Sequence, residues 1–102
     1  MADGETIRLD RFLWFARLAK TRSAAQAIAE KGTLRLDGRR VERSAAPVRV
    51  GAIVVFPLYG KVHALRVEAL PKRRGPPAEA ALLYTRLETQ LPKDVDAAES
   101  EA

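Results

Sequence analysis

The residues best suited to chemistry in this sequence are its cations. Residues 8–74 contain 16 Lys or Arg against 5 Asp or Glu, although the whole chain of 102 residues has a formal net charge of only +5. Lysine and arginine bind phosphate oxygens as charged donors, arginine through a planar fork. A small domain with such a field attracts polyanions, of which RNA is the most common in a cytoplasm. A generic basic surface without a specific partner is the alternative.

The cations come from three segments that a compact fold would bring together. One is a first helix predicted at residues 9–17, the second is the connector 20–22, and the third is the return strand of a hairpin at 39–43. Hydroxyl and amide side chains beside the connector could add neutral hydrogen bonds to phosphate or ribose 2′-hydroxyl oxygens. The predicted RNA contacts are Arg8, Arg11, Arg17, Lys20, Thr21, Arg22, Ser23, Gln26, Arg39, Arg40 and Arg43. A solvated face that binds nothing is the other interpretation.

No set of residues in the sequence points to catalysis. The chain has one histidine and no cysteine, and it contains no pattern of a Ser/His/Asp triad, a metal-ligand cluster or a phosphate-cradling glycine loop. His63 shares a strand face with Leu65 and Val67, which is typical of a histidine at the edge of a core. We therefore expect no catalytic residue, no metal site and no cofactor.

Trp14 is the sole tryptophan, and its position allows two interpretations. It shares a helical stripe with Asp10, Arg17 and Thr21, beside the predicted core face. In the first interpretation the indole stacks on an unpaired base, a contact that contributes roughly 1 to 3 kcal/mol. In the second it packs against the sheet or a third helix. The stripe favours packing.

Apolar spacing predicts two helices in the first third of the chain. From Leu9 to Ala16 the apolar residues recur at i, i+3, i+4 and i+7, which places them on one core-facing side. Residues 23–26 have the Ser-x-x-Gln capping-box spacing, and the alanine-rich segment behind them ends at Gly32, a natural left-handed stop. A second helix of about 10 residues would thus begin at Ser23. Its N-terminal dipole adds to the charge of the connector and favours a phosphate there.

After the second helix the apolar period changes to two, which indicates strands. Residues 34–37 alternate, Asp37-Gly38 is a hairpin-turn dipeptide, a buried strand is predicted at 53–56, and alternation returns at 62–70. These segments predict a small antiparallel sheet.

Helical spacing returns near the end of the sequence, where a third helix is predicted to pack on the body through Ala80, Leu83, Tyr84 and Leu87. The length suits one domain with one core. No stretch approaches the roughly 18 apolar residues of a membrane span, and no secretion signal is visible, so we expect a cytoplasmic protein. The predicted organisation is an N-terminal extension at 1–7, the domain with its sheet at 8–72, the helix segment at 73–90 and a disordered acidic tail at 91–102.

Four stretches of this pattern resemble the S4-type RNA-binding domain, named after a ribosomal protein. They are residues 8–17 (Arg-Leu-Asp-Arg-Phe-Leu-Trp-Phe-Ala-Arg), 20–25 (Lys-Thr-Arg-Ser-Ala-Ala), Gly32 and 37–39 (Asp-Gly-Arg). The resemblance covers roughly residues 8–56 and implies an α+β fold, the αL motif, with two short helices packed on a small bent antiparallel sheet. A C-terminal helix would be added here. The domain occurs in proteins of several functions, so it does not fix one.

The second half resembles one family more narrowly. Residues 73–74 (Arg-Arg) and 79–84 (Glu-Ala-Ala-Leu-Leu-Tyr) are similar to the segment after the domain in the heat-shock protein 15 family, so the likeness extends to about residue 88. That family of bacterial proteins binds the free large ribosomal subunit that still carries a nascent chain on tRNA, and helps to recycle subunits stalled after heat stress.

The resemblance implies a partner and a set of contacts. Ribosomal RNA would be the partner, with tRNA as a further candidate. The contacts carried over by matching position are Arg8, Arg11, Arg17, Lys20, Thr21, Arg22 and Arg39. Family members extend into a longer basic tail, whereas residues 92–102 are acidic here, so the contacts of that tail are not carried over.

The sequence therefore predicts a non-catalytic, monomeric, cytoplasmic RNA-binding protein of the ribosome. Two alternatives stay open. One is an accessory protein of ribosome assembly, or another rRNA- or tRNA-binding protein. The other is a protein-interaction module that uses the helix face around Tyr84, with the basic surface serving solubility only.

Overall fold

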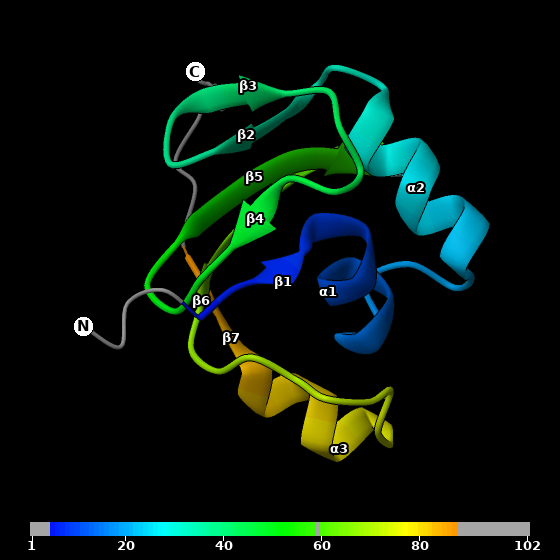
Figure 1. Cartoon of the computed structure of the whole chain (residues 1–102), viewed down its shortest axis with the longest axis vertical. Coiled ribbons are helices and arrows are strands. Elements are labelled where there is room, and N and C mark those ends of the chain that lie inside the picture. The colour runs from blue at the N-terminus through cyan, green and yellow to red at the C-terminus, as the bar shows by residue number, and fades with distance from the viewer. Residues whose placement is uncertain (1–4, 59, 88–102) are drawn as a thin grey trace.

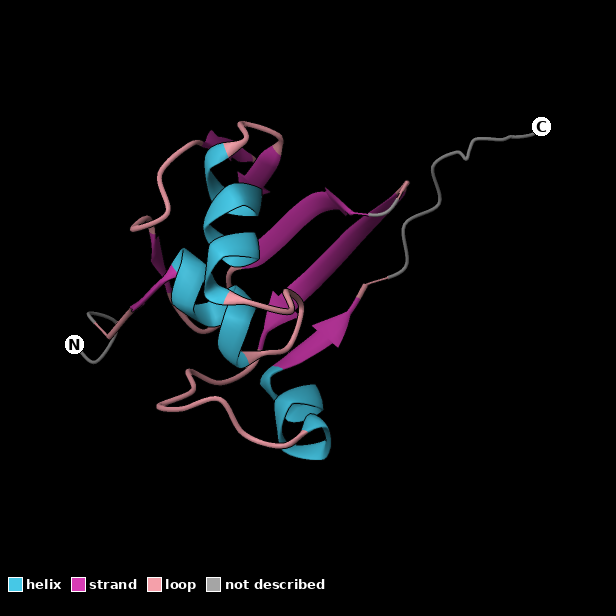
Figure 2. Ribbon diagram, turned by 90° about the vertical axis from the view of Figure 1, so that its right-hand side faces the viewer, coloured by secondary structure: helices cyan, strands magenta, loops and turns pink. Residues whose placement is uncertain are grey.

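A computed structural model describes residues 5–58 and 60–87, and the predicted acidic tail lies outside them. Two short helices, α1 (Leu9–Phe15) and α2 (Arg22–Glu30), lie together on one side of an antiparallel sheet (Figure 1). The same two layers are visible when the molecule is turned (Figure 2). This arrangement is the predicted α+β fold. In the described residues no helix is long and apolar enough to cross a membrane.

The core-facing side of α1 is the predicted one. Leu9, Phe12 and Leu13 are fully buried, and Ala16 is nearly so. They pack against Ala25 and other apolar residues of α2 and the sheet in a single cluster. Truncating a fully buried phenylalanine such as Phe12 to alanine typically costs about 3 to 5 kcal/mol, so this contact fixes the orientation of α1.

The cap of helix α2 lies two residues earlier than the capping-box pattern predicts. Thr21 is the N-cap: its backbone is extended and its Oγ1 accepts a hydrogen bond from the Ala24 amide at 3.0 Å. The prediction of Ser23 as the cap is wrong, because Thr21 has the same N-cap-to-N3 spacing to Ala24 and takes this role. At the other end Gly32 has a φ of +87°, which confirms the left-handed stop.

The main sheet has five antiparallel strands in the order β3-β2-β5-β6-β7. Asp37 and Gly38 both have positive φ, as the tight two-residue turn between β2 and β3 requires. The inner strand β5 places Val54 and Phe56 in the core, so the sheet buries the face towards the helices. Its strands are β2 (Leu34–Leu36), β3 (Arg39–Val41), β5 (Ile53–Leu58), β6 (Lys61–Val67) and β7 (Tyr84–Arg86).

A separate two-stranded sheet joins the start of α1 to the segment after β3. Strand β1 (Ile7–Arg8) pairs antiparallel with β4 (Pro47–Val48). Two further backbone hydrogen bonds, from Leu9 N to Ala46 O and from Asp10 N to the carbonyl of residue 44, continue this contact at 2.9 and 3.0 Å. The chain entering α1 therefore lies beside the segment that follows the β2–β3 hairpin.

The predicted third helix is much shorter than its apolar spacing indicates. Helix α3 spans Pro77–Ala80, a single 3-10 turn follows at Ala81–Leu83, and the chain then continues as strand β7. The prediction is wrong from Tyr84 onward, because the free edge of β6 pairs with this segment and satisfies backbone groups that a helix would leave open. Leu83 and Tyr84 still pack against the core, as predicted. The division of the chain at residue 72 stays a prediction.

Candidate nucleic-acid interface

The turn between α1 and α2 gathers arginines around the single tryptophan. The guanidinium carbon of Arg22 lies 5.6 Å from the centroid of the Trp14 ring, and that of Arg74 lies 5.5 Å from it. Trp14 is half-buried and packs against the core, so the packing interpretation is confirmed, yet its exposed part is bordered by cations. Lys20 is exposed in the connector between the two helices. We call Trp14, Arg17, Lys20, Arg22 and Arg74 the Trp14 corner.

Reciprocal hydrogen bonds fasten residues 74–75 to this corner. Arg17 Nε donates to the Gly75 carbonyl at 2.7 Å, and Arg74 Nε donates to the Trp14 carbonyl at 3.1 Å. Arg17 has a φ of 61°, a left-handed conformation that costs a non-glycine residue about 1 to 2 kcal/mol. Arg17 is exposed, as predicted for an RNA contact, but it also has this structural role.

Arg8 and Asp10 form a paired charge at the start of α1. Two guanidinium nitrogens of Arg8 donate to the two Asp10 oxygens at 3.1 Å, and the Arg11 amide donates to Oδ1 at 2.7 Å. Asp10 is only 5% exposed. Burial alone would raise the pKa of Asp10, but the hydrogen bonds from Arg8 and the Arg11 amide, the charge of Arg8 and a hydrogen bond from Gln26 hold it below its ordinary value. Arg8 is thus partly neutralised.

The three neutral residues of the predicted site, Thr21, Ser23 and Gln26, have different roles in the structure. Thr21 is committed as the cap of α2, and the Gln26 side chain acts on Asp10, so both have structural roles. Ser23 is exposed in the first turn of α2 and is not the cap. Of the three, Ser23 is the one left without such a role.

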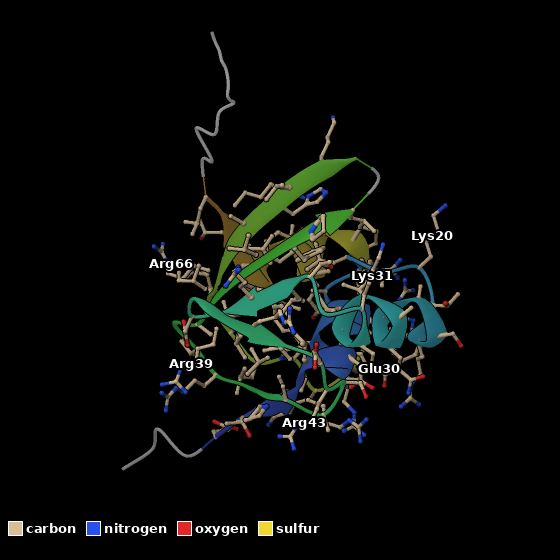
Figure 3. All side chains as sticks on the ribbon, turned by 90° about the horizontal axis from the view of Figure 1, so that it is seen from above. Lys20, Glu30, Lys31, Arg39, Arg43 and Arg66 are labelled. Atoms are coloured by element: carbon tan, nitrogen blue, oxygen red, sulfur yellow. The ribbon has the colours of Figure 1, made fainter. Side chains whose placement is uncertain are left out.

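The hairpin arginines line an open groove of about 800 Å³. Arg39, Arg40 and Arg43, all predicted contacts, are joined there by Arg49, which the sequence reasoning missed. Arg40 pairs with Glu42 at 3.0 Å. We call Arg39, Arg40, Arg43 and Arg49 the hairpin groove. Figure 3 shows Arg39 and Arg43 far from Lys20, so the hairpin groove and the Trp14 corner are separate places on the surface.

A second groove of about 480 Å³ continues the basic surface across β4. Arg8, Arg11 and Lys72 line it, and Pro47 lines both this groove and the hairpin groove. The structure therefore brings Arg8 and Arg11 next to the hairpin arginines. Residues 20–26 line neither groove. The predicted contact set is thus divided between two areas.

Arg49, Lys72 and Arg74 are the cations of this surface that the prediction left out. Lys72 and Arg74 belong to a run of three cations whose charge was visible, but whose position depends on contacts across about sixty residues of sequence. Arg49 stands alone after β4, and no local pattern marks it.

His63 lies at the core edge, as predicted. Its ring stacks on Phe56 with centroids 5.4 Å apart, its Nε2 lies 3.3 Å from the Leu58 carbonyl, and Arg86 lies 3.0 Å from Nδ1. Within residues 5–58 and 60–87, no three histidine, cysteine or acidic side chains are grouped as metal ligands.

The fold and its basic surface define an RNA-binding protein built on an S4 domain. The S4 domain family model matches residues 7–54. The heat shock protein 15 homolog of Haemophilus influenzae is 39% identical over 94 residues, which is 91% of this chain and 70% of that protein. Heat shock protein 15 of Escherichia coli K12 is 36% identical over 78 residues, 76% of this chain and 58% of that one.

A solved structure supports the same assignment. Vibrio cholerae heat shock protein 15, described as trimeric, matches with a TM-score of 0.75 and 31% identity, covering 81% of this chain and 83% of that one. The chain belongs to the heat shock protein 15 family.

Proposed function

We propose that this protein binds ribosomal RNA of the free large subunit that carries a stalled nascent chain, and aids subunit recycling under heat stress. One observation carries the RNA contact: Arg39, Arg43 and Arg49 line one groove, and their guanidinium groups form no hydrogen bond or ion pair with the described residues. Guanidinium groups without protein acceptors are suited to phosphate oxygens, which they bind in a bidentate geometry.

The mechanism is placement without catalysis. Double-stranded RNA is recognised largely through its shape, its phosphates and its 2′-hydroxyl groups. Two separated basic areas, the Trp14 corner and the hairpin groove, suit such recognition because they contact the backbone at two points and thereby set the orientation of the protein. Ser23 would add a neutral hydrogen bond in this scheme. A cytoplasmic location and a possible additional contact with tRNA belong to the same proposal.

Cosedimentation tests this function. The purified protein is centrifuged with free large subunits, free small subunits and joined ribosomes at two salt concentrations, beside a Lys20→Ala/Arg22→Ala variant. Salt-sensitive enrichment on free large subunits, lost in the variant, is the expected result, since each neutralised phosphate adds about 0.7 to 0.9 to the slope of log affinity against log salt. Equal binding to every particle would contradict the large-subunit assignment.

The helix face that the protein-interaction alternative requires around Tyr84 is not formed. Tyr84 was expected on an open helix face, but it lies in β7, half-buried against the core, with the Arg86 guanidinium 5.9 Å from its ring centroid. The proposed unit of RNA binding is one chain. Because the Vibrio cholerae relative is described as trimeric, sedimentation velocity with and without RNA is the test, and a trimer would overturn the monomer.

A further inference from the structure

Three arginines from distant parts of the chain meet at the Trp14 corner. Arg17 follows α1, Arg22 is the first residue of α2, and Arg74 belongs to the segment after β6. Arg74 lies outside the S4 domain match, which ends at residue 54. The corner is therefore completed by a residue from beyond the motif.

Each of these guanidinium groups is held in place by contacts that leave its terminal nitrogens free. Arg17 and Arg74 use their Nε atoms to donate to the backbone carbonyls of Gly75 and Trp14. Arg22 is held over the Trp14 ring. In the described residues the terminal nitrogens of these three side chains have no hydrogen-bond acceptor. A positioned guanidinium with free terminal donors is ready to bind an oxyanion without a further loss of side-chain entropy.

The charges of the corner are not balanced by the protein. Other arginines have carboxylate partners, among them Arg73, the neighbour of Arg74, which lies 3.1 Å from Glu79. No described acidic side chain pairs with Arg17, Arg22 or Arg74. The guanidinium carbons of Arg22 and Arg74 lie 5.6 and 5.5 Å from the Trp14 ring centroid, so an anion bound beside the ring would offset their positive charges.

The backbone at Gly75 joins the segment after β6 to the corner. Gly75 is buried, and a Cβ at this position would collide with the carboxylate of Glu79. Glu79 is half-exposed, so its carboxylate could move aside, and the contact that holds the segment at the corner is the hydrogen bond from Arg17 to the Gly75 carbonyl. The position of Arg74, one residue earlier, is fixed by this contact.

We propose that Arg74 is an RNA-binding residue and that it forms, with Arg17 and Arg22, a site for a backbone phosphate of RNA beside Trp14. The inference rests on the proposed function and deepens it, because it makes the segment after the S4 motif part of the same interface. Trp14 acts as the platform that positions Arg22 and Arg74.

The test compares Arg74→Gln with the matched neighbour variant Arg73→Gln. Each removes one positive charge, and glutamine keeps a donor for the Trp14 carbonyl. Binding of a short fluorescein-labelled RNA hairpin with a single-stranded flank is followed by anisotropy over a salt series. With Arg74→Gln the log-log slope should fall by about 0.7 to 0.9, and the affinity by roughly sixfold at 0.1 M salt. Arg73→Gln should leave the slope unchanged, since its charge is already paired.

A structural role alone would not change the salt slope, and circular dichroism with a melting curve identifies a variant that fails to fold. In that case Arg74→Lys, which keeps the charge, must recover the slope. The fluorescence of Trp14, the sole tryptophan, gives an independent readout in the wild type. Its emission should change as the RNA hairpin is added and reach a plateau when the protein is saturated. Equal slopes for the two glutamine variants, or RNA binding without a change in emission, would overturn the site. Failure of the large-subunit proposal appears separately, in cosedimentation.

Discussion

The Trp14 corner and the β6–β7 edge both expose arginines, but Arg66 at the edge is paired with a carboxylate, whereas within the described residues no arginine of the corner is. At the edge, Arg66 donates to Glu68 at 3.0 Å, Thr85 donates to the same carboxylate oxygen at 2.7 Å, and Arg86 lies against His63. At the corner, Arg17 and Arg74 donate to backbone carbonyls, which leaves their positive charge in place. The same residue type therefore joins strands in one region and produces a positive field in the other.

This difference shows that the number of cations does not locate a binding site. An ion pair at the surface largely cancels its own field beyond the pair, whereas a guanidinium held by a neutral carbonyl keeps its full charge. The unpaired arginines are thus the ones that an RNA phosphate would meet. Variants that remove equal charge from paired and from unpaired arginines test this rule.

The largest effect is expected from Lys20→Ala/Arg22→Ala at the corner. Losing two phosphate contacts should weaken RNA binding roughly 40-fold at 0.1 M salt and lower the log-log slope by about 1.4 to 1.8. Thermal stability should change by no more than about 0.5 kcal/mol, because both side chains are exposed. Anisotropy titration and a melting curve measure the two quantities.

The matched control is Arg66→Ala/Arg73→Ala, which removes the same charge from two arginines that are paired with Glu68 and Glu79. We expect its affinity for RNA to change by less than about twofold, because only nonspecific attraction is lost. Its melting temperature should fall only slightly, since two ion pairs at the surface are lost. If both double variants lose affinity equally, binding follows total charge and the comparison fails.

The parts of the fold also differ in how far their structure could be predicted from the sequence. The core side of α1 and the turn at residues 37–38 were predicted correctly because each depends on neighbours within one turn or one hairpin. The left-handed stop at Gly32 is equally local. Even the error at Ser23 was local: Thr21 offers the same spacing to a backbone amide, and the pattern alone does not decide between the two hydroxyls.

The segment after β6 could not be predicted in this way. Leu83, Tyr84 and Leu87 have helical spacing, but an open edge of β6 imposed a strand on Tyr84–Arg86. Arg74 depends on carbonyls and a ring about sixty residues away in sequence. Such contacts follow from tertiary packing, which overrides local spacing and propensity. The sequence therefore predicted the site residues whose positions depend on near neighbours. It missed those whose positions depend on contacts between distant segments.

An effect of intermediate size is expected at the buried pair, with Asp10→Asn. This variant removes the negative charge that accepts hydrogen bonds from Arg8 and the Arg11 amide. It should lower the free energy of unfolding by about 1 to 2 kcal/mol near neutral pH. The folded state lowers the pKa of Asp10 below the ordinary 3.8, so this stability is present above that value and is lost as the pH falls through the folded-state pKa. Denaturant melts across pH should therefore bring wild type and variant together in acid. A constant difference at all pH values would show that packing, rather than charge, is responsible.

The smallest effect is expected from Glu68→Gln at the edge. The Thr85 hydroxyl and Arg66 hold the pKa of Glu68 below its ordinary 4.5, in the same direction as at Asp10. The stability from this carboxylate is likewise present above 4.5 and lost as the pH falls through the lowered pKa. However, the Glu68 side chain is 38% exposed, against 5% for Asp10.

Water and salt screen the Glu68 pair, so its removal should lower the melting temperature only slightly at neutral pH and not at all in acid. Added salt should diminish that small difference while leaving most of the difference for Asp10→Asn. Melting curves of the two variants at low and high salt measure this. A larger, salt-resistant loss for Glu68→Gln would mean that the edge carboxylate acts through the backbone of β7, and that balanced charge at a surface can stabilise as much as a buried pair.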